Sequence, residues 1–181
     1  MELMYKFLFL TLFTCLSYQA DEVTITWSED LTLQWSDFKG EPKPVGDAVA
    51  TTASGISFGY STTKSSSGLV DYSFSITAHF YPYKSWTINE PLSNIVLTHE
   101  RLHFDITELY ARKFRQRVSN TTFTNAINKE MERINNAINF ELGEMQKKYD
   151  AETNHSQNTE QQIAWQHFIK AELDKLSRYG N

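Results

Sequence analysis

The spacing of hydrophobic positions divides the chain into two parts near residue 90. Before that point, apolar and polar residues alternate in short runs such as VTITW and LTLQW, which we interpret as a hairpin around an acidic turn. Two longer runs, ATTASGISFGYSTT and GLVDYSFSITAHFYPYKSW, flank the serine-rich turn at residues 65–68. A period of two is typical of strands that bury one face, so residues 23–88 are predicted to form an antiparallel sheet.

After residue 90, apolar residues recur at intervals of three and four. Residues 89–91, Asn-Glu-Pro, resemble a helix start, and this first helix is predicted to end near residues 118–120. A second helix is predicted from about Thr122, and a third over about residues 157–176. The apolar stripe of the second helix, which we interpret as a packing face, comprises Ile127, Met131, Ile134, Ile138, Leu142 and Met145. The chain is therefore predicted to be an α+β protein in which an N-terminal antiparallel β-sheet precedes three helices.

The N-terminus has a pattern of its own. Lys6 precedes FLFLTLFTCLSYQA, an apolar run too short to span a bilayer comfortably, and polar residues follow it. We interpret residues 1–20 as a secretory signal peptide and residues 21–181 as a single domain. The expected location is secreted or periplasmic, with no stable membrane insertion after the leader is cleaved. The only cysteine, Cys15, lies in the leader, which is compatible with export without disulfides.

Composition narrows the function classes. With 181 residues the chain is long enough for one well-formed core, and its net charge is −5. A nucleic-acid groove needs a basic face, so no nucleic-acid partner is expected.

The first helix carries an HExxH motif, His99-Glu100-Arg101-Leu102-His103. Residues four apart on a helix lie about 40° apart around its axis, so both imidazoles can reach one zinc ion at roughly 2.0–2.1 Å. Glu100 then occupies the general-base position of zinc metalloproteases. Apolar neighbours such as Leu102 and Ile106 indicate that this helix is buried, where polar groups without partners are costly. We therefore favour a zinc site over a surface helix that happens to carry two histidines and an acid.

A zinc site that hydrolyses its substrate needs a third protein ligand and an open position for water. The position six residues after His103, where one class of zinc protease has a histidine, is Leu109. Asp105 and Glu108 project from the far side of the helix, about 180–200° away, so they are better suited to pairing with Arg112 or orienting a histidine. The third ligand must come from another segment.

Three other histidines are available. His155 lies in the polar loop TNHSQ, where a backbone turn can direct it at the metal, and we prefer it to His79, Asp150 or a glutamate. His167, on the third helix, ranks last. Asp150 is alternatively placed to accept the N–H of a ligand histidine. Tyr149 is a candidate donor to a developing oxyanion, and a packing role is its alternative.

The run HERLHFDITELYARKF, with SW in the strand before it and YDAETNHSQN and QQIAW after it, resembles the secreted bacterial proteins grouped as domain of unknown function 922. That family is regarded as zinc-dependent proteases because of its HExxH motif. The resemblance extends from the WSDF segment to the last helix. It implies a zincin-like fold with the motif on the first long helix, and the YDAETNH match supports a functional role for His155.

These features predict a secreted zinc-dependent peptidase. Zn²⁺ would be held by His99, His103 and His155, with Glu100 as general base and a peptide or protein as substrate. Two alternatives stay open: an exported zinc-binding or scaffold module without catalysis, and another zinc-dependent amide hydrolase. The adjacent base Glu100 distinguishes the catalytic alternatives from a purely structural site.

Overall fold

A computed structural model describes residues 22–43, 48–66, 68–88 and 93–180. The predicted signal peptide lies outside these residues. None of the described helices is long and apolar enough to cross a membrane.

The strands form one long ribbon and a short second sheet. The ribbon pairs β3 (Ser54–Ser65) with β4 (Gly68–Phe80), and β1 (Ile25–Thr26) adds to the other edge of β4, so that the order is β1-β4-β3. The second sheet pairs β2 (Ala50–Thr51) with β5 (Trp86–Thr87). All of these pairs are antiparallel. Together with the helices that follow, they confirm the predicted α+β class.

The predicted hairpin between VTITW and LTLQW is absent from the described residues, because β1 pairs with β4 instead. The LTLQW segment is an irregular stretch that leads into the 3-10 turn η1 (Trp35–Asp37). Its Leu33 is buried, and the carbonyl of Leu33 accepts a hydrogen bond of 2.6 Å from Nε of Arg101. The segment thus packs its side chains and a backbone carbonyl against a helix, where alternation alone would predict a strand.

Three helices make up the second half of the chain. They are α1 (Asn94–Ser119), α2 (Ile127–Thr153) and α3 (Thr159–Lys175), and the 3-10 turn η2 (Ser177–Tyr179) follows them. Ser93 caps α1, and the predicted start at residues 89–91 lies outside the described residues. The α2 helix begins five residues later than predicted. Thr124 lies before its first turn, and the backbone N–H and hydroxyl of Thr124 donate hydrogen bonds to Glu130 within that turn.

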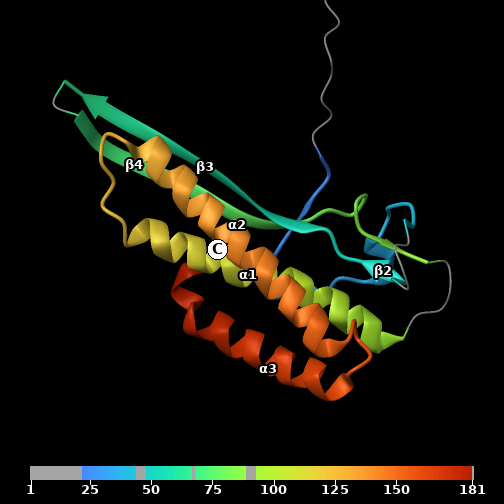
Figure 1. Cartoon of the computed structure of the whole chain (residues 1–181). Helices are drawn as coiled ribbons and strands as arrows, with labels where there is room; N and C mark the ends of the chain where they lie inside the picture. Colours follow the sequence, from blue (N-terminus) through green and yellow to red (C-terminus); the bar gives the residue numbers. More distant parts are fainter. Residues whose placement is uncertain (1–21, 44–47, 67, 89–92, 181) are drawn as a thin grey trace, which may run out of the picture.

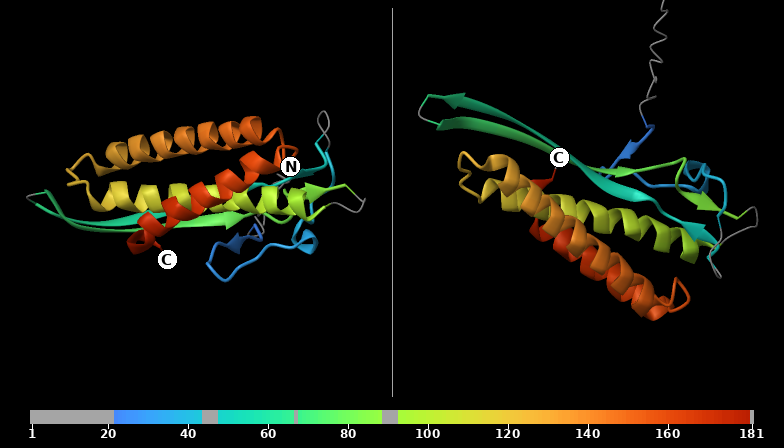
Figure 2. Two further views of the ribbon diagram at one scale, coloured as in Figure 1. Left: turned by 90° about the horizontal axis from the view of Figure 1, so that it is seen from below. Right: turned by 45° about the horizontal axis from the view of Figure 1, so that its top comes forward.

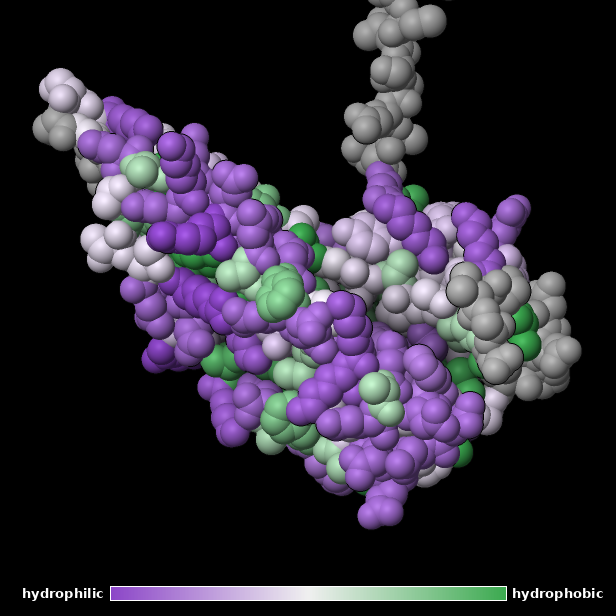
Figure 3. Space-filling view, in the orientation of Figure 1, coloured by the Kyte–Doolittle hydropathy of each residue, from purple (hydrophilic) through white to green (hydrophobic). Residues whose placement is uncertain are grey.

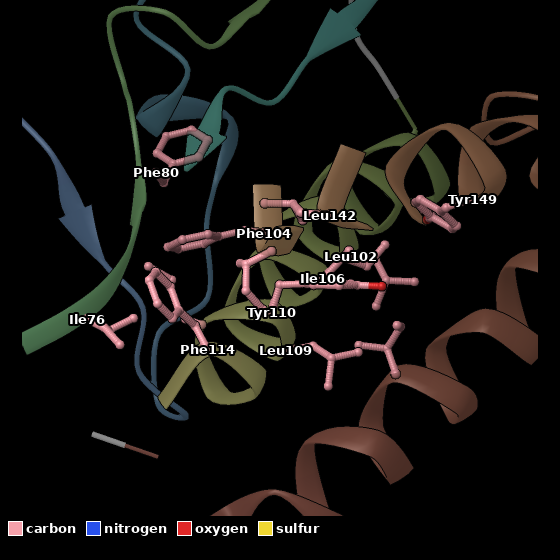
Figure 4. Close-up of a cluster of buried hydrophobic side chains, with 14 of the residues drawn as sticks. Ile76, Phe80, Leu102, Phe104, Ile106, Leu109, Tyr110, Phe114, Leu142 and Tyr149 are labelled. Carbon is pink, nitrogen blue, oxygen red and sulfur yellow. The ribbon is translucent and has the colours of Figure 1, made fainter. Parts of the chain in front are cut away.

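The α1 helix lies between the β3–β4 ribbon on one side and α2 and α3 on the other (Figures 1 and 2). In the ribbon, Phe58 opposite Ile76 faces the helix, whereas Ser57 opposite Thr77 belongs to the outer face. Figure 4 shows the resulting core, in which side chains of β4, α1 and α2 meet. The outward faces of α2 and α3 are mostly hydrophilic (Figure 3). Almost every side chain of α1 between Leu102 and Phe114 is therefore enclosed by protein.

Burial of α1 includes a charged cluster on the side predicted to face away from the histidines. The fully buried carboxylate of Glu108 accepts hydrogen bonds from Nε of Arg112 at 2.9 Å and from Nη1 of Arg115 at 3.0 Å. Further along the same side, Asp105 accepts a hydrogen bond from the indole of Trp27 at 2.8 Å. These acids are thus partnered at a distance from the motif, as the helix geometry predicts.

Glu108→Ala is expected to lower the free energy of unfolding by about 3–5 kcal/mol, because it leaves two buried guanidinium groups without their carboxylate. Glu141→Ala is the matched control. It breaks the pair between Glu141 and Arg117, whose side chains are 37% and 38% exposed, and should cost at most about 1 kcal/mol. Urea denaturation of the three proteins measures both values, and equal losses in the two variants would contradict the predicted ranking.

Candidate metal centre

The two histidines of the motif lie on the face of α1 that contacts the C-terminal half of α2. Their rings are 4.8 Å apart between centroids and nearly perpendicular. The two Nε2 atoms face each other at 3.2 Å. Side-chain exposure is 5% for His99 and 13% for His103, so both imidazoles are largely withdrawn from solvent. The helix thus presents two nitrogen atoms at one point, as the four-residue spacing predicts.

Asp150 of α2 completes a triangle with these nitrogens. Its Oδ1 atom lies 3.2 Å from Nε2 of His99 and 3.0 Å from Nε2 of His103. A tetrahedral zinc ion with bonds of about 2.0–2.2 Å holds its ligand atoms roughly 3.3–3.6 Å apart. The three atoms therefore already have nearly the spacing of zinc ligands. Asp150 is the most exposed of the three side chains, at 32%, so solvent reaches the triangle from its side.

Glu100 is buried beside this triangle. Its carbonyl accepts a hydrogen bond of 3.0 Å from Oγ1 of Thr52, which fixes the helix against the chain between β2 and β3. Its Oε2 atom and Nδ1 of His99 are buried without a hydrogen-bond partner among the described residues. Buried polar atoms are normally paired, so an unpaired carboxylate oxygen at this position is typical of a site that binds something more.

Electrostatics couple the members of the site. Burial acts to lower the pKa of His103, but the hydrogen bond to Asp150 and the charge of Glu100 outweigh it and raise that pKa. Burial acts to raise the pKa of Asp150, and the hydrogen bonds to His103 and His99 overcome it and hold that pKa well below its usual range. Asp150 is therefore an ionised carboxylate at neutral pH, as a metal ligand must be.

Tyr149, considered above as a donor to an oxyanion, packs against the site instead. Its ring stacks on His99, with centroids 4.5 Å apart and planes 21° apart. Its hydroxyl donates to the carbonyl of His99 at 3.3 Å, and the residue is fully buried, which raises its pKa. This geometry makes Tyr149 a packing partner that holds the His99 ring, with its hydroxyl engaged by the backbone.

His155, the preferred third ligand from the sequence, lies outside the triangle. Its Nδ1 atom is 3.9 Å from Oδ1 of Asp150, and its side chain is 75% exposed. The reason is that α2 continues as regular helix to Thr153, so Asp150 reaches the histidines directly from the helix. The loop then turns through left-handed residues, Asn154 at φ 46° and His155 at φ 49°. Asp150, one of the alternatives that the sequence left open, is therefore the residue that lies within reach of a metal held by the two histidines.

The other two histidines are also elsewhere. His79 lies on the ribbon and shares a hydrogen bond of 2.7 Å between its Nε2 atom and the hydroxyl of Ser57. His167 is an exposed residue of α3. Neither belongs to the group of side chains among the described residues that could hold a metal ion, which is His99, His103 and Asp150.

Gln146 is a site residue that the sequence reasoning missed. Its Oε1 atom is hydrogen-bonded to Nδ1 of His103, and its Nε2 atom donates to the carbonyl of His103 at 2.9 Å. The signal was present in the sequence, because Gln146, Tyr149 and Asp150 have the spacing of three and four that places residues on one helix face.

The chain matches a known protein family over more than half of its length. A model of the family described as "Bacterial protein of unknown function (DUF922)" matches residues 38–157, which include the triangle and Glu100. This confirms the resemblance noted in the sequence. No curated protein and no solved structure matches the chain.

Asp150→Ala is expected to abolish stoichiometric zinc binding, because it removes one of the three converging atoms. His155→Ala, a change in an exposed side chain five residues away, should leave zinc affinity close to that of the wild type. Competition with a chromophoric chelator measures both affinities. Zinc binding that survives in Asp150→Ala but is lost in His155→Ala would restore the ligand role to His155.

Proposed function

We propose that this chain, which belongs to the bacterial family of unknown function DUF922, is an exported zinc-dependent hydrolase of peptide bonds. Zinc would be held by His99, His103 and Asp150. The observation that carries this proposal is the triangle of three donor atoms, 3.0–3.2 Å apart, from α1 and α2, beside the buried Glu100. The proposed substrate is a peptide or protein outside the cytoplasm.

The donor set suits the proposed ion. Two imidazole nitrogens and one carboxylate oxygen are the ligand types of catalytic zinc, which leave a fourth position for water or substrate. The unpaired oxygen of Glu100 supports the same assignment, since a zinc-bound water is the partner that such a carboxylate would accept a proton from. Exposure of Asp150 supplies an approach to the fourth position.

The chemistry that zinc supplies when bound is polarisation of the scissile carbonyl and a lowered pKa for the attacking water. Glu100 would act as the general base, accepting a proton at its unpaired carboxylate oxygen and returning it to the leaving nitrogen. His103 and His99 are held in place by Gln146 and Tyr149, so the motif keeps its geometry through the reaction. The contact from Thr52 to the carbonyl of Glu100 holds the base near the strands that border the site.

A second candidate is an exported zinc-binding module without catalysis, and burial favours it. Glu100 is only 5% exposed, and two of the three proposed ligands, His99 and His103, have side chains only 5% and 13% exposed. A groove of about 470 Å³ between the N-terminal segment, α1 and α3 is lined by residues such as Trp27, Arg101 and Asp105, on the side of α1 away from the histidines. The two functions differ in whether the zinc-loaded protein hydrolyses peptides, and only the first requires Glu100.

The purified protein is expected to bind about one zinc ion per chain, and His99→Ala is expected to bind none, because a single imidazole and carboxylate give too few ligands. Elemental analysis after reconstitution and gel filtration measures the ratio. Equal zinc contents in wild type and His99→Ala, whether both zero or both one, would contradict the proposed site.

Glu100→Gln should keep the zinc and the fold but lower peptide hydrolysis by at least about 10²–10⁴-fold, because glutamine preserves the shape and removes the proton acceptor. Cleavage of a broad peptide library, followed by mass spectrometry, measures turnover. Undiminished turnover in this variant would remove Glu100 from the mechanism. A zinc-loaded wild type that cleaves nothing in the library would favour the non-catalytic module.

A further inference from the structure

We propose that Gln146 is a positioning residue that fixes the ring of His103 through a hydrogen bond from Nδ1 and so leaves Nε2 as the atom that binds zinc. The inference rests on the proposed zinc site and deepens it. It is carried by the hydrogen bonds around the Gln146 amide, which the HExxH motif does not include.

The orientation of the Gln146 amide is fixed by its other contacts. The Nε2 atom donates to the carbonyl of His103 at 2.9 Å and approaches Oγ1 of Thr107 at 3.3 Å. The reverse orientation would set the amide oxygen against a carbonyl oxygen, which is repulsive. Oε1 must therefore face Nδ1 of His103, and it can only accept a hydrogen bond there. This bond requires a proton on Nδ1.

The amide is itself held by the sheet. The hydroxyl of Thr107 donates to the same carbonyl of His103 at 3.1 Å and shares a hydrogen bond of 2.7 Å with the hydroxyl of Ser54, the first residue of β3. Gln146 thus connects one proposed ligand to α2 and, through Thr107, to the ribbon. Such connections orient metal ligands and raise their affinity for the ion.

Two acceptors compete for the proton of His103. Oδ1 of Asp150 lies 3.0 Å from Nε2, and Oε1 of Gln146 contacts Nδ1 on the other side of the ring. With Gln146 removed, the carboxylate would favour the tautomer with the proton on Nε2, where it blocks the metal. His99 has no equivalent partner, since its Nδ1 atom has none among the described residues, and its ring is held by Tyr149 instead.

An amide also differs from the carboxylate that often occupies this position beside a ligand histidine. Two neutral imidazoles and one carboxylate leave the proposed zinc site with one net positive charge. Because Gln146 is neutral, it orients His103 without offsetting that charge. The proposed site therefore gains no negative charge beyond those of Asp150 and Glu100.

The test compares zinc affinities of the full chain with three variants. Gln146→Met removes both hydrogen bonds at similar volume, Gln146→Glu restores an acceptor for Nδ1, and Lys147→Met is the matched control on the exposed face, where the lysine is 77% exposed. Gln146→Met is expected to weaken zinc binding by about 10–100-fold, with Lys147→Met unchanged and Gln146→Glu recovering most of the loss. In zinc-loaded wild type, the Nδ1 proton of His103 should exchange slowly with solvent by NMR, and in Gln146→Met it should exchange fast.

The outcomes separate the inference from the function on which it rests. Wild type that takes up no zinc overturns both. Wild type that binds zinc, with Gln146→Met of equal affinity, overturns only the role of Gln146. Equal losses in Gln146→Glu and Gln146→Met would show that packing alone is responsible, and would also overturn it. If the metal-free Gln146→Met protein does not fold by circular dichroism, Gln146→Asn, which keeps the amide but falls short of the ring, replaces it.

Discussion

The enclosure of α1 between a sheet and two helices determines how the rest of the molecule is arranged. Polar side chains in the buried middle of this helix have little access to solvent, so most of them pair within the helix or with a neighbouring element. Glu108 finds Arg112 and Arg115, and the histidines find Asp150 and Gln146. The Glu108 cluster and the proposed metal centre thus both provide partners for buried polar side chains, on opposite sides of one helix.

The proposed metal centre is formed by two helices in contact, and each contributes residues spaced three or four apart on one face. On α1 these are the two histidines of the motif, and on α2 they are Gln146, Tyr149 and Asp150. A ligand supplied by a regular helix has a position set by backbone hydrogen bonds and by core packing, including the contact of Tyr149 with Trp165. Rigid elements hold catalytic geometry more precisely than loops do, which suits a zinc site with few exposed atoms.

The sequence predicted the features that depend on neighbours along the chain. Alternation at β3 and β4, the helical periods, and the reach of His99 and His103 to a common point are all local, and the structure has them. The sequence did not predict that Asp150 rather than His155 contacts the histidines, because this depends on where α2 packs along the length of α1. A shift of one helical turn, about 5.4 Å, would exchange one set of contacts for another. The strand predicted for LTLQW was wrong for a related reason, since the conformation of this segment depends on its contacts with Arg101 and with the core.

The arginines of α1 also connect the helix to segments that lie far before and far after it in the sequence. Arg115 donates to the carbonyl of Ile76 in β4 at 2.9 Å and to that of Tyr179 in η2 at 2.7 Å, and Arg112 donates to that of Leu173 at 2.8 Å. The acceptors on Leu173 and Tyr179 lie 61 and 64 residues after their arginines, whereas Ile76 lies 39 residues before Arg115. Without residues 173–179, the two guanidinium groups would keep unmatched donors in the interior, so the charged cluster around Glu108 depends on α3 and η2 as well as on the sheet.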